Sequence, residues 1–302
     1  MPEIIEDTLI RLSAALGERV VASRRLVAAI RCGGRPLRSG TLWRQDAVVA
    51  SEQALPDVAE AEVILDGGQT FAARVAGRDR GTNIAVLRLD GGPQPAPHAA
   101  ATGPEPGALV LAIGADPAGG VAVRLGAVHS VGPAWHSRAG GQIDRRITLD
   151  LRLEQAEEGG PVVDAAGGLV GISTLGPRRR VLVIPAATVE RVLDPLLTNG
   201  RVARGWLGAA VQPVLVPDEL RTEAGQPLGL MVIGLTRGGP AAQAGIMMGD
   251  ILIGVDGAGL GSPSELAGML GPESVGRQVQ LRLIRGGAVQ ALAVTVGARP
   301  VR

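Results

Sequence analysis

Histidine and cysteine, the side chains that carry most acid–base, nucleophilic and metal chemistry, are scarce in this chain of 302 residues. The three histidines, His98, His129 and His136, have no cysteine or carboxylate cluster at metal-ligand spacing beside them. The single cysteine, Cys32, follows the apolar run 26–30 and is interpreted as a buried structural thiol. As the only cysteine it can form no intrachain disulfide. We therefore expect neither a metal site nor a cofactor.

Two adjacent carboxylates, Glu157 and Glu158, stand in the segment 156–163. Paired carboxyl groups can act as acid and base in hydrolysis. Neighbouring carboxylates in a loop are more often solvated or ion-paired, and that is our interpretation. The glycine-rich stretch 257–262 lacks the lysine of a phosphate-binding loop and is interpreted as a turn.

Short apolar runs bounded by turn residues fill the chain from 19 to about 193 and predict strands. Their spacing favours a sandwich or barrels over alternating strands and helices. The Pro- and Ala-rich stretch 93–106 is interpreted as a linker between two halves. Apolar spacing predicts a helix over 3–16 that stops at Gly17 and caps the first half, with an oligomerisation element as the alternative. Strands are expected at 26–31, 47–50, 61–65, 71–76, 84–89, 108–113, 121–131, 146–151, 161–164, 168–173 and 180–184, and a closing helix at 185–198.

The last hundred residues differ in texture. Strands are expected there at 207–212, 229–235, 250–255, 278–285 and 288–296, with helices at 240–244 and 263–270.

Five short motifs follow one another in a fixed order. They are Arg38-Ser39-Gly40-Thr41-Leu42, Asp66-Gly67-Gly68-Gln69-Thr70-Phe71, Thr82-Asn83-Ile84-Ala85-Val86-Leu87, Ala112–Gly119 and Ala156–Val163. Further on, Gly239–Leu252 contains the pattern Pro-Ala-x-x-Ala-Gly-Ile-x-x-Gly-Asp. In this order and spacing the chain resembles the HtrA/DegP family, trypsin-like serine proteases with a C-terminal PDZ domain.

The resemblance implies a mainly β protein with a chymotrypsin-like double six-stranded β-barrel followed by a PDZ domain, a small β-barrel with two helices. The domains implied are an N-terminal helix at 1–17, the double barrel at 18–198 with halves at about 18–95 and 105–198, and the PDZ domain at 203–299.

The resemblance also locates three catalytic positions, and all three are changed. The base, orienting acid and nucleophile positions hold Gln53, Asn83 and Glu158. Catalysis by such a triad needs an imidazole, an acid and a hydroxyl, and a carboxylate opposes the charge of the oxyanion. The nearby Ser51 and Ser173 have no evident base. We therefore predict no catalytic residues and an inactive homologue of a serine endopeptidase.

PDZ domains bind extended peptides by adding a strand beside a groove helix. The segment Arg204–Ala209 matches the family loop that holds the peptide carboxylate. The resemblance implies these peptide-binding residues: Trp206, Leu207, Gly208, Ala209, Val211, Leu266 and Leu270.

We predict an HtrA-like pseudoprotease that serves as a peptide- or protein-binding scaffold or adaptor through its PDZ domain. One alternative is an active HtrA-type serine endopeptidase in protein quality control. A second is a structural subunit of a larger assembly. The expected partners are protein or peptide C-termini, and an oligomer or hetero-complex stays open.

With a formal net charge of +1, the chain lacks the positive electrostatic field that binding a nucleic-acid backbone requires, so we expect no nucleic-acid partner. The one basic cluster, 178–180, is interpreted as a solvated loop, with an anion or partner contact as the alternative. No apolar stretch is long enough to predict a membrane span. Residues 1–16 lack the basic start and apolar core of a secretory signal, which predicts a cytoplasmic protein.

Overall fold

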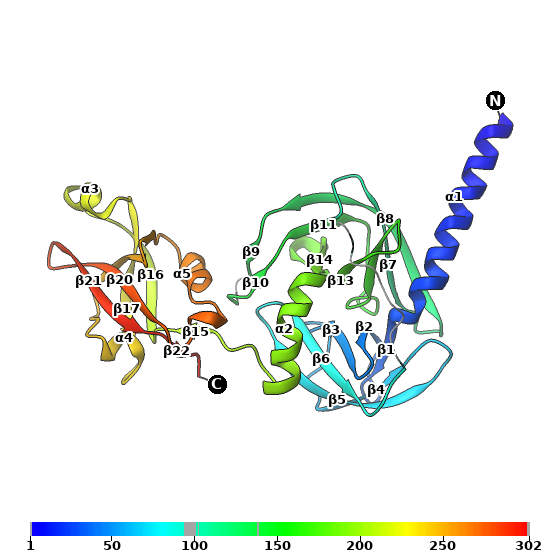
Figure 1. Ribbon diagram of the computed structural model, residues 1–302, viewed down its shortest axis with the longest axis horizontal. Coiled ribbons are helices and arrows are strands. Elements are labelled where there is room, and N and C mark those ends of the chain that lie inside the picture. Colours follow the sequence, from blue (N-terminus) through cyan, green and yellow to red (C-terminus); the bar gives the residue numbers. More distant parts are fainter. Residues whose placement is uncertain (1, 94–100, 102, 138, 301–302) are drawn as a thin grey trace. The chain divides into compact units, whose positions relative to one another are not determined.

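The computed structural model describes residues 2–93, 101, 103–137 and 139–300, with side chains of the first helix from residue 7 onward. The chain divides into two compact units, Met1–Trp135 with Ile143–Arg201, and His136–Gln142 with Val202–Arg302 (Figure 1). His98 and much of the expected linker 93–106 lie outside the described residues.

The first barrel is closed by six antiparallel strands in the order β1-β2-β3-β6-β5-β4. The strands are β1 (Val27–Arg31), β2 (Arg38–Arg44), β3 (Ala47–Ser51), β4 (Glu60–Ile64), β5 (Thr70–Asp79) and β6 (Ile84–Leu89). Aliphatic side chains such as Ile30, Leu42 and Leu87 fill the interior. The whole chain has three Trp, one Phe and no Tyr, so aliphatic side chains must supply most of the core. Branched aliphatic side chains pack well on pleated strands.

The second barrel closes in the order β11-β14-β13-β12-β7-β8. Its strands are β7 (Leu109–Ala115), β8 (Val121–Gly132), β11 (Arg146–Asp150), β12 (Pro161–Asp164), β13 (Leu169–Leu175) and β14 (Val181–Pro185). Val110, Val162 and Val183 belong to its core. A two-stranded sheet of β9 (Trp135–His136) and β10 (Gln142–Ile143) interrupts the series. The predicted pair of six-stranded barrels is confirmed.

Helix α2 (Ala186–Asn199) contacts β5 and β6 of the first barrel and β13 and β14 of the second. It buries Val189, Val192, Leu193 and Leu196 on one face, as its periodicity predicts. Gly200 ends it with a φ of 70°, a left-handed conformation that favours glycine. The helix therefore joins the two barrels.

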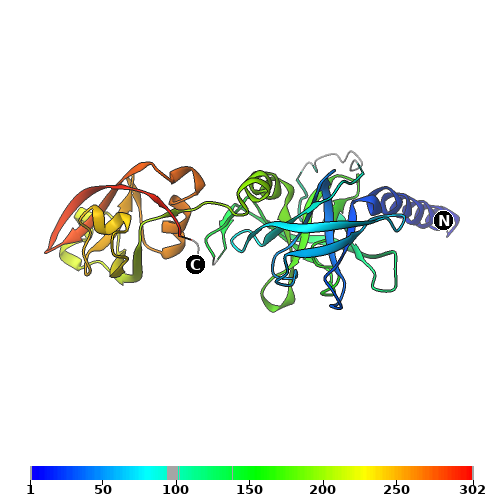
Figure 2. The ribbon, with the colours of Figure 1, turned by 90° about the horizontal axis from the view of Figure 1, so that it is seen from below.

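Helix α1 (Pro2–Ser23) is longer than predicted and runs through Gly17. The predicted end at residue 17 is wrong because a single glycine costs a helix only about 1 kcal/mol and good helix formers follow it. The helix leads away from the barrels (Figures 1 and 2), and its contacts reach β7 of the second barrel, so the expected cap on the first barrel is also wrong.

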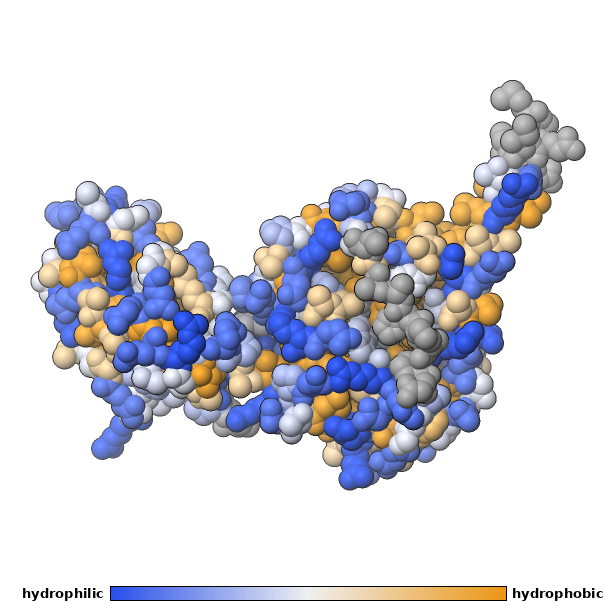
Figure 3. Space-filling view, viewed as in Figure 1, coloured by the Kyte–Doolittle hydropathy of each residue, from blue (hydrophilic) through white to orange (hydrophobic). Residues whose placement is uncertain are grey.

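Apolar residues stay on the surface of α1 (Figure 3), where Leu9 and Ile10 are 61% and 62% exposed. Within the described ranges, neither α1 nor any other helix combines the length and apolar content that crossing a membrane requires.

The second unit is built on an antiparallel sheet in the order β16-β17-β18-β20-β21, with β19 paired to β18. Its elements are β15 (Gly205–Trp206), β16 (Ala209–Leu215), α3 (Arg221–Ala224), β17 (Leu228–Leu235), α4 (Pro240–Gln243), β18 (Ile251–Val255), β19 (Ala258–Gly259), α5 (Pro263–Met269), β20 (Gln278–Arg285), β21 (Ala288–Thr295) and β22 (Gly297–Ala298). Leu230, Leu252 and Leu281 lie in its core.

Short 3-10 turns occur in both units: at Arg24–Leu26 and Pro177–Arg179 in the first, and at Asp218–Leu220 and Pro272–Ser274 in the second.

Candidate functional site

Gln53, Asn83 and Glu158 converge where the two barrels meet. Gln53 stands two residues beyond β3, Asn83 directly precedes β6, and Glu158 lies in the turn before β12. The main-chain N–H of Gln53 donates to Asn83 Oδ1 at 2.8 Å, and Gln53 Nε2 donates to Glu158 Oε1 at 2.5 Å. The three positions that the motifs single out therefore form one site.

The Glu158 carboxylate is buried and accepts four hydrogen bonds at one oxygen. The residue is 3% exposed. Besides Gln53, its Oε1 accepts from Thr174 Oγ1 at 2.7 Å, Ser51 Oγ at 2.9 Å and the Leu175 N–H at 3.2 Å. Charge-assisted bonds of this kind compensate for burying an anion.

Ser51 and Thr174 connect the remaining groups. Asn83 Nδ2 donates to Thr174 Oγ1 at 2.7 Å and to Ser51 Oγ at 3.1 Å. Gln53 Nε2 also reaches the Leu175 carbonyl at 2.7 Å. We call this set the Glu158 cluster; its members are Ser51, Gln53, Asn83, Glu158, Thr174 and the main chain of Leu175. It links side chains of both barrels.

Glu157 is also buried, at 4% exposed, and points to a different partner. Arg124 Nε donates to Glu157 Oε1 at 3.0 Å, and Nη2 lies 2.8 Å from the same oxygen. This hydrogen bond and the Glu157 charge raise the pKa of Arg124 above its ordinary value. The ion pair agrees with the sequence interpretation, but neither carboxylate is solvated, because the turn that carries them packs between the barrels.

The turn 156–160 is held by side-chain hydroxyls of the first barrel that donate to its backbone carbonyls. Ser39 Oγ donates to the Ala156 carbonyl at 2.6 Å, and Thr41 Oγ1 donates to the Gly159 carbonyl at 3.0 Å. A Cβ at Gly160 would stand 2.0 Å from the Ile113 carbonyl oxygen. Packing against β7 thus requires glycine at residue 160, whatever the neighbouring residues do.

The hydroxyl groups of the site are not available to a substrate. Ser51 and Ser173 are 0% and 1% exposed. Ser51 Oγ donates to Glu158, and Ser173 Oγ donates to the Glu157 carbonyl at 3.3 Å. No imidazole of the described residues hydrogen-bonds to this cluster, and no group of three or more described His, Cys, Asp or Glu residues is arranged to hold a metal. The cluster offers acceptors and donors that already have partners.

The residues expected to bind peptide surround the start of β16. Trp206 is half-buried, Leu207 is buried, and Gly208 has a φ of 77°. Ala209 and Val211 lie on β16 and pack against the core. On α5, Leu266 is 8% exposed, and Leu270, at 6%, directly follows the helix, which ends one residue earlier than predicted.

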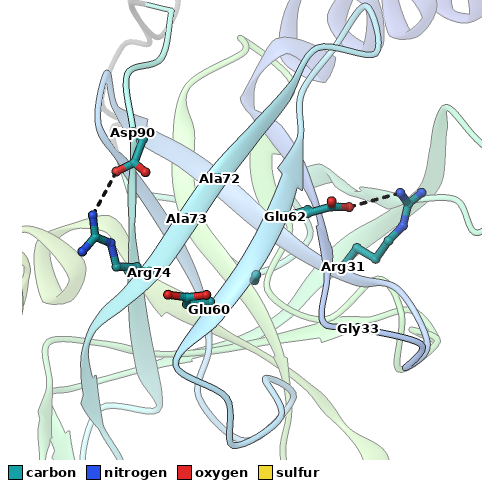
Figure 4. Close-up of a pocket in the computed structure, with 9 residues that line it drawn as sticks. Arg31, Gly33, Glu60, Glu62, Ala72, Ala73, Arg74 and Asp90 are labelled. Carbon is teal, nitrogen blue, oxygen red and sulfur yellow. Dashed lines mark hydrogen bonds and ion pairs between the residues drawn. The ribbon is translucent and has the colours of Figure 1, made fainter.

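A hollow of about 520 Å³ lies on the first barrel, lined by residues of β1, β4 and β5 (Figure 4). Arg31 pairs with Glu62 at 3.4 Å and Arg74 with Asp90 at 3.7 Å, as Figure 4 shows. These four side chains are more than half exposed, so the pairs contribute little. The hollow shares no residue with the Glu158 cluster.

Comparison with known proteins places this geometry in context. A family model for the trypsin-like peptidase domain matches residues 38–172, and one for the PDZ domain matches residues 205–296. The chain is of the HtrA/DegP type. The predicted fold, a mainly β double barrel followed by a PDZ domain, is confirmed.

The curated relatives are probable periplasmic serine endoproteases, DegP-like. That of Brucella suis is 29% identical over 273 residues, covering 87% of this chain and 52% of the relative. That of Halomonas elongata is 30% identical over 281 residues, covering 88% of this chain and 57% of the relative. The chain spans about half the length of the curated relatives it matches.

Solved structures of this HtrA/DegP type match nearly end to end. The HtrA-type protease AlgW with a tripeptide is 26% identical with a TM-score of 0.76, covering 95% of this chain and 98% of that one. The serine endoprotease from Yersinia pestis is 25% identical with a TM-score of 0.76, covering 94% and 98%.

The names of these relatives bear on two sequence predictions. They favour the alternative of a serine endopeptidase over the inactive homologue. They contradict the prediction of a cytoplasmic protein, because the curated relatives are named periplasmic. That prediction relied on the first residues of the given sequence, and those residues do not decide the compartment of an HtrA/DegP-type chain.

Proposed function

We propose that this chain is a non-proteolytic HtrA-type protein that binds the C-termini of proteins or peptides in its PDZ groove, as a scaffold or adaptor. The proposal rests on the residue that occupies the nucleophile position. Glu158 stands there, 3% exposed, with four hydrogen bonds to one carboxylate oxygen. A side chain held in this way supports a structural role.

The chemistry of the triad supports the same reading. The amide of Gln53 cannot take a proton from a nucleophile, and Asn83 carries no charge to stabilise an imidazolium. Removing one member of such a triad lowers the rate constant by roughly 10⁴- to 10⁶-fold, and three members differ here. The carboxylate of Glu158 adds negative charge where an oxyanion would form.

The geometry of the second unit supports peptide binding. Strand β16 is at the edge of its sheet, paired with β17 but with no other described strand. Helix α5 contacts β16 and carries the buried Leu266. An edge strand beside a helix can take up an extended peptide as an added strand, and the loop Trp206–Ala209 at its start would receive the terminal carboxylate.

A serine endopeptidase is the second candidate, and the names of the relatives favour it. It would need a hydroxyl nucleophile with a base, outside the Glu158 cluster or released from it.

The names of the curated relatives also support a periplasmic location for this protein, which fractionation of its native cells would test.

Proteolysis separates the two candidates. Purified protein is incubated with casein and, separately, with a fluorophosphonate probe that labels activated serines, beside an active HtrA-type protease. We expect neither fragments nor labelling. Casein cleavage that disappears when one serine, such as Ser51 or Ser173, is changed to Ala would establish the endopeptidase instead.

Peptide binding is tested without changing the protein. A library of peptides with free C-termini is screened, and the best binder is made again with a C-terminal amide. Because charge-assisted bonds to the carboxylate are lost, we expect the amide to bind about tenfold more weakly or worse. Equal affinity of the two peptides, or no enriched peptide, would refute the proposal that the groove binds peptide C-termini.

A further inference from the structure

Three consecutive arginines occupy the tip of the hairpin that joins β13 to β14. The Gly176 N–H donates to the Arg180 carbonyl at 2.8 Å, and the Arg180 N–H donates to the Pro177 carbonyl at 3.3 Å. Leu175 and Val181 form the last ladder pair below the tip. Arg178, Arg179 and Arg180 are therefore carried on a short loop closed by its own backbone.

The backbone of this tip is strained at two of its arginines. Arg178 and Arg179 have φ values of 57° and 58°. The other two non-glycine residues with positive φ in the described part of the chain are Asn83 and Asp256, which tolerate this conformation better. For arginine the left-handed conformation is unfavourable, because Cβ comes too close to the following carbonyl oxygen. Strain of this kind is concentrated at functional sites.

The three guanidinium groups have no partner among the described residues. All three residues are exposed, and no ion pair or side-chain hydrogen bond joins them to another described residue. Arginines in neighbouring parts of the unit are paired, for example Arg124 with Glu157 and Arg191 with Asp144. In a chain of net charge +1, this is a concentrated, unneutralised positive patch.

The patch borders the Glu158 cluster. Leu175 donates its N–H to Glu158 and accepts from Gln53 through its carbonyl, and the tip begins at the next residue. A guanidinium binds a carboxylate through two parallel hydrogen bonds. Three charges are fewer than the four to eight basic residues that typically hold a protein on an anionic membrane. The net charge also argues against a nucleic acid.

We propose that the tip Arg178–Arg180 is a docking site for an acidic segment of a partner polypeptide. The site is distinct from the PDZ groove and does not depend on whether the protein is proteolytic.

The probe is a fluorescein-labelled decaglutamate peptide with a C-terminal amide, so that a PDZ carboxylate site cannot hold it. Fluorescence anisotropy measures its affinity for the whole chain and for the variant Arg178→Gln, Arg179→Gln, Arg180→Gln. We expect the variant to bind about tenfold more weakly, because three exposed charge pairs are lost. We also expect wild-type binding to weaken as salt rises from about 50 to about 300 mM.

A matched control loses the same charge elsewhere in the first unit. It carries Arg25→Gln, Arg35→Gln and Arg201→Gln, three exposed residues outside the hairpin. It should bind the peptide within about twofold of wild type. An equal loss in both variants, or wild-type affinity no better than that of the tip variant, would overturn the proposal. Tighter, tip-dependent binding to phosphatidylserine vesicles than to the peptide would overturn it in favour of a membrane.

Discussion

The Glu158 cluster and the PDZ groove differ in whether their polar groups have hydrogen-bond partners within the chain. In the cluster, Glu158, Thr174 and Asn83 are all partnered within the chain. In the described residues, the one buried side-chain polar atom without a partner is Trp135 Nε1, which is outside the cluster. In the groove, β16 has one paired side and one edge that no described strand covers.

The two units of the chain therefore hold two kinds of site, one internally satisfied and one open to a ligand. Groups that satisfy one another across two barrels stabilise the junction and leave nothing for a substrate to bind. An edge strand leaves main-chain donors and acceptors for a ligand. The contrast supports a structural role for the junction between the barrels and a binding role for the groove.

The largest effect is expected at Gly160, in the turn of the cluster. A Cβ there would stand 2.0 Å from the Ile113 carbonyl oxygen, so Gly160→Ala forces the turn away from β7. We expect the free energy of unfolding to fall by more than about 3 kcal/mol. Urea denaturation followed by circular dichroism measures it.

Gly17→Ala is the control, because nothing lies within 4 Å of a Cβ at that helical position. It should be neutral or stabilise the protein by up to about 1 kcal/mol. A Gly160 variant as stable as this control would show that the turn packs loosely against β7.

Glu158→Ala removes the acceptor at the centre of the cluster. The buried hydroxyls of Ser51 and Thr174 would then lose their acceptor, and the exposed Gln53 amide would keep only its bonds to Thr174 and Leu175. At about 1–3 kcal/mol for an unsatisfied buried group, with some donors repairing one another, we expect a loss of about 3 kcal/mol. Glu154→Ala, an exposed residue of the same loop, removes the same charge and should change stability by less than about 0.5 kcal/mol. Equal effects would mean that Glu158 contributes only charge.

The motifs predicted which residues meet, because motif order fixes strand order in a barrel. Gln53, Asn83 and Glu158 are far apart in sequence and yet hydrogen-bond or share partners. Thr174 escaped prediction although it contacts all three. It lies one residue beyond the predicted strand 168–173, in β13, which is buried through Thr174. Its role depends on which residues the other barrel brings to it.

Features that depend on distant partners were harder to read. The burial of Glu157 follows from Arg124, 33 residues earlier, whose role no local pattern indicates. Strand β5 runs to Asp79, three residues beyond the predicted end, past a register shift between Val75 and Gly77. Local propensity is a weak guide where pairing decides the end of a strand.

Acid should weaken the second unit through Asp250, which is 2% exposed. Burial raises the pKa of Asp250, but hydrogen bonds from Arg285 and the Met247 N–H outweigh it, so the pKa lies below its ordinary value. A carboxyl with a depressed folded-state pKa stabilises the protein above the unfolded pKa of about 4, and this is lost as pH falls through the folded-state value.

The test compares urea midpoints at neutral pH and near pH 3 for wild type and Arg285→Gln. The acid-induced loss should be smaller in Arg285→Gln, because the variant has already lost the pair. Arg277→Gln, an exposed residue, should retain the wild-type loss. An unchanged pH dependence in Arg285→Gln would assign the acid sensitivity to other carboxyl groups.

The smallest effect is expected at the helix that borders the groove. Ser262 Oγ accepts the Glu265 N–H at 3.2 Å, and Glu265 Oε2 accepts the Ser262 N–H at 3.2 Å, a capping box at the start of α5. Ser262→Ala should destabilise the helix by about 1 kcal/mol.

Because α5 carries Leu266 beside β16, fraying of its first turn lowers the fraction of protein with a formed groove. The apparent affinity for a C-terminal peptide should fall with that fraction, by about twofold to fivefold. Ser264→Ala, in the same turn, removes the bond between the Ser264 and Ser262 hydroxyls but leaves both capping bonds in place, and should bind within error of wild type. If Ser262→Ala lowered stability but left peptide affinity unchanged, α5 would not form a wall of the groove, and the contrast with the Glu158 cluster would lose its binding side.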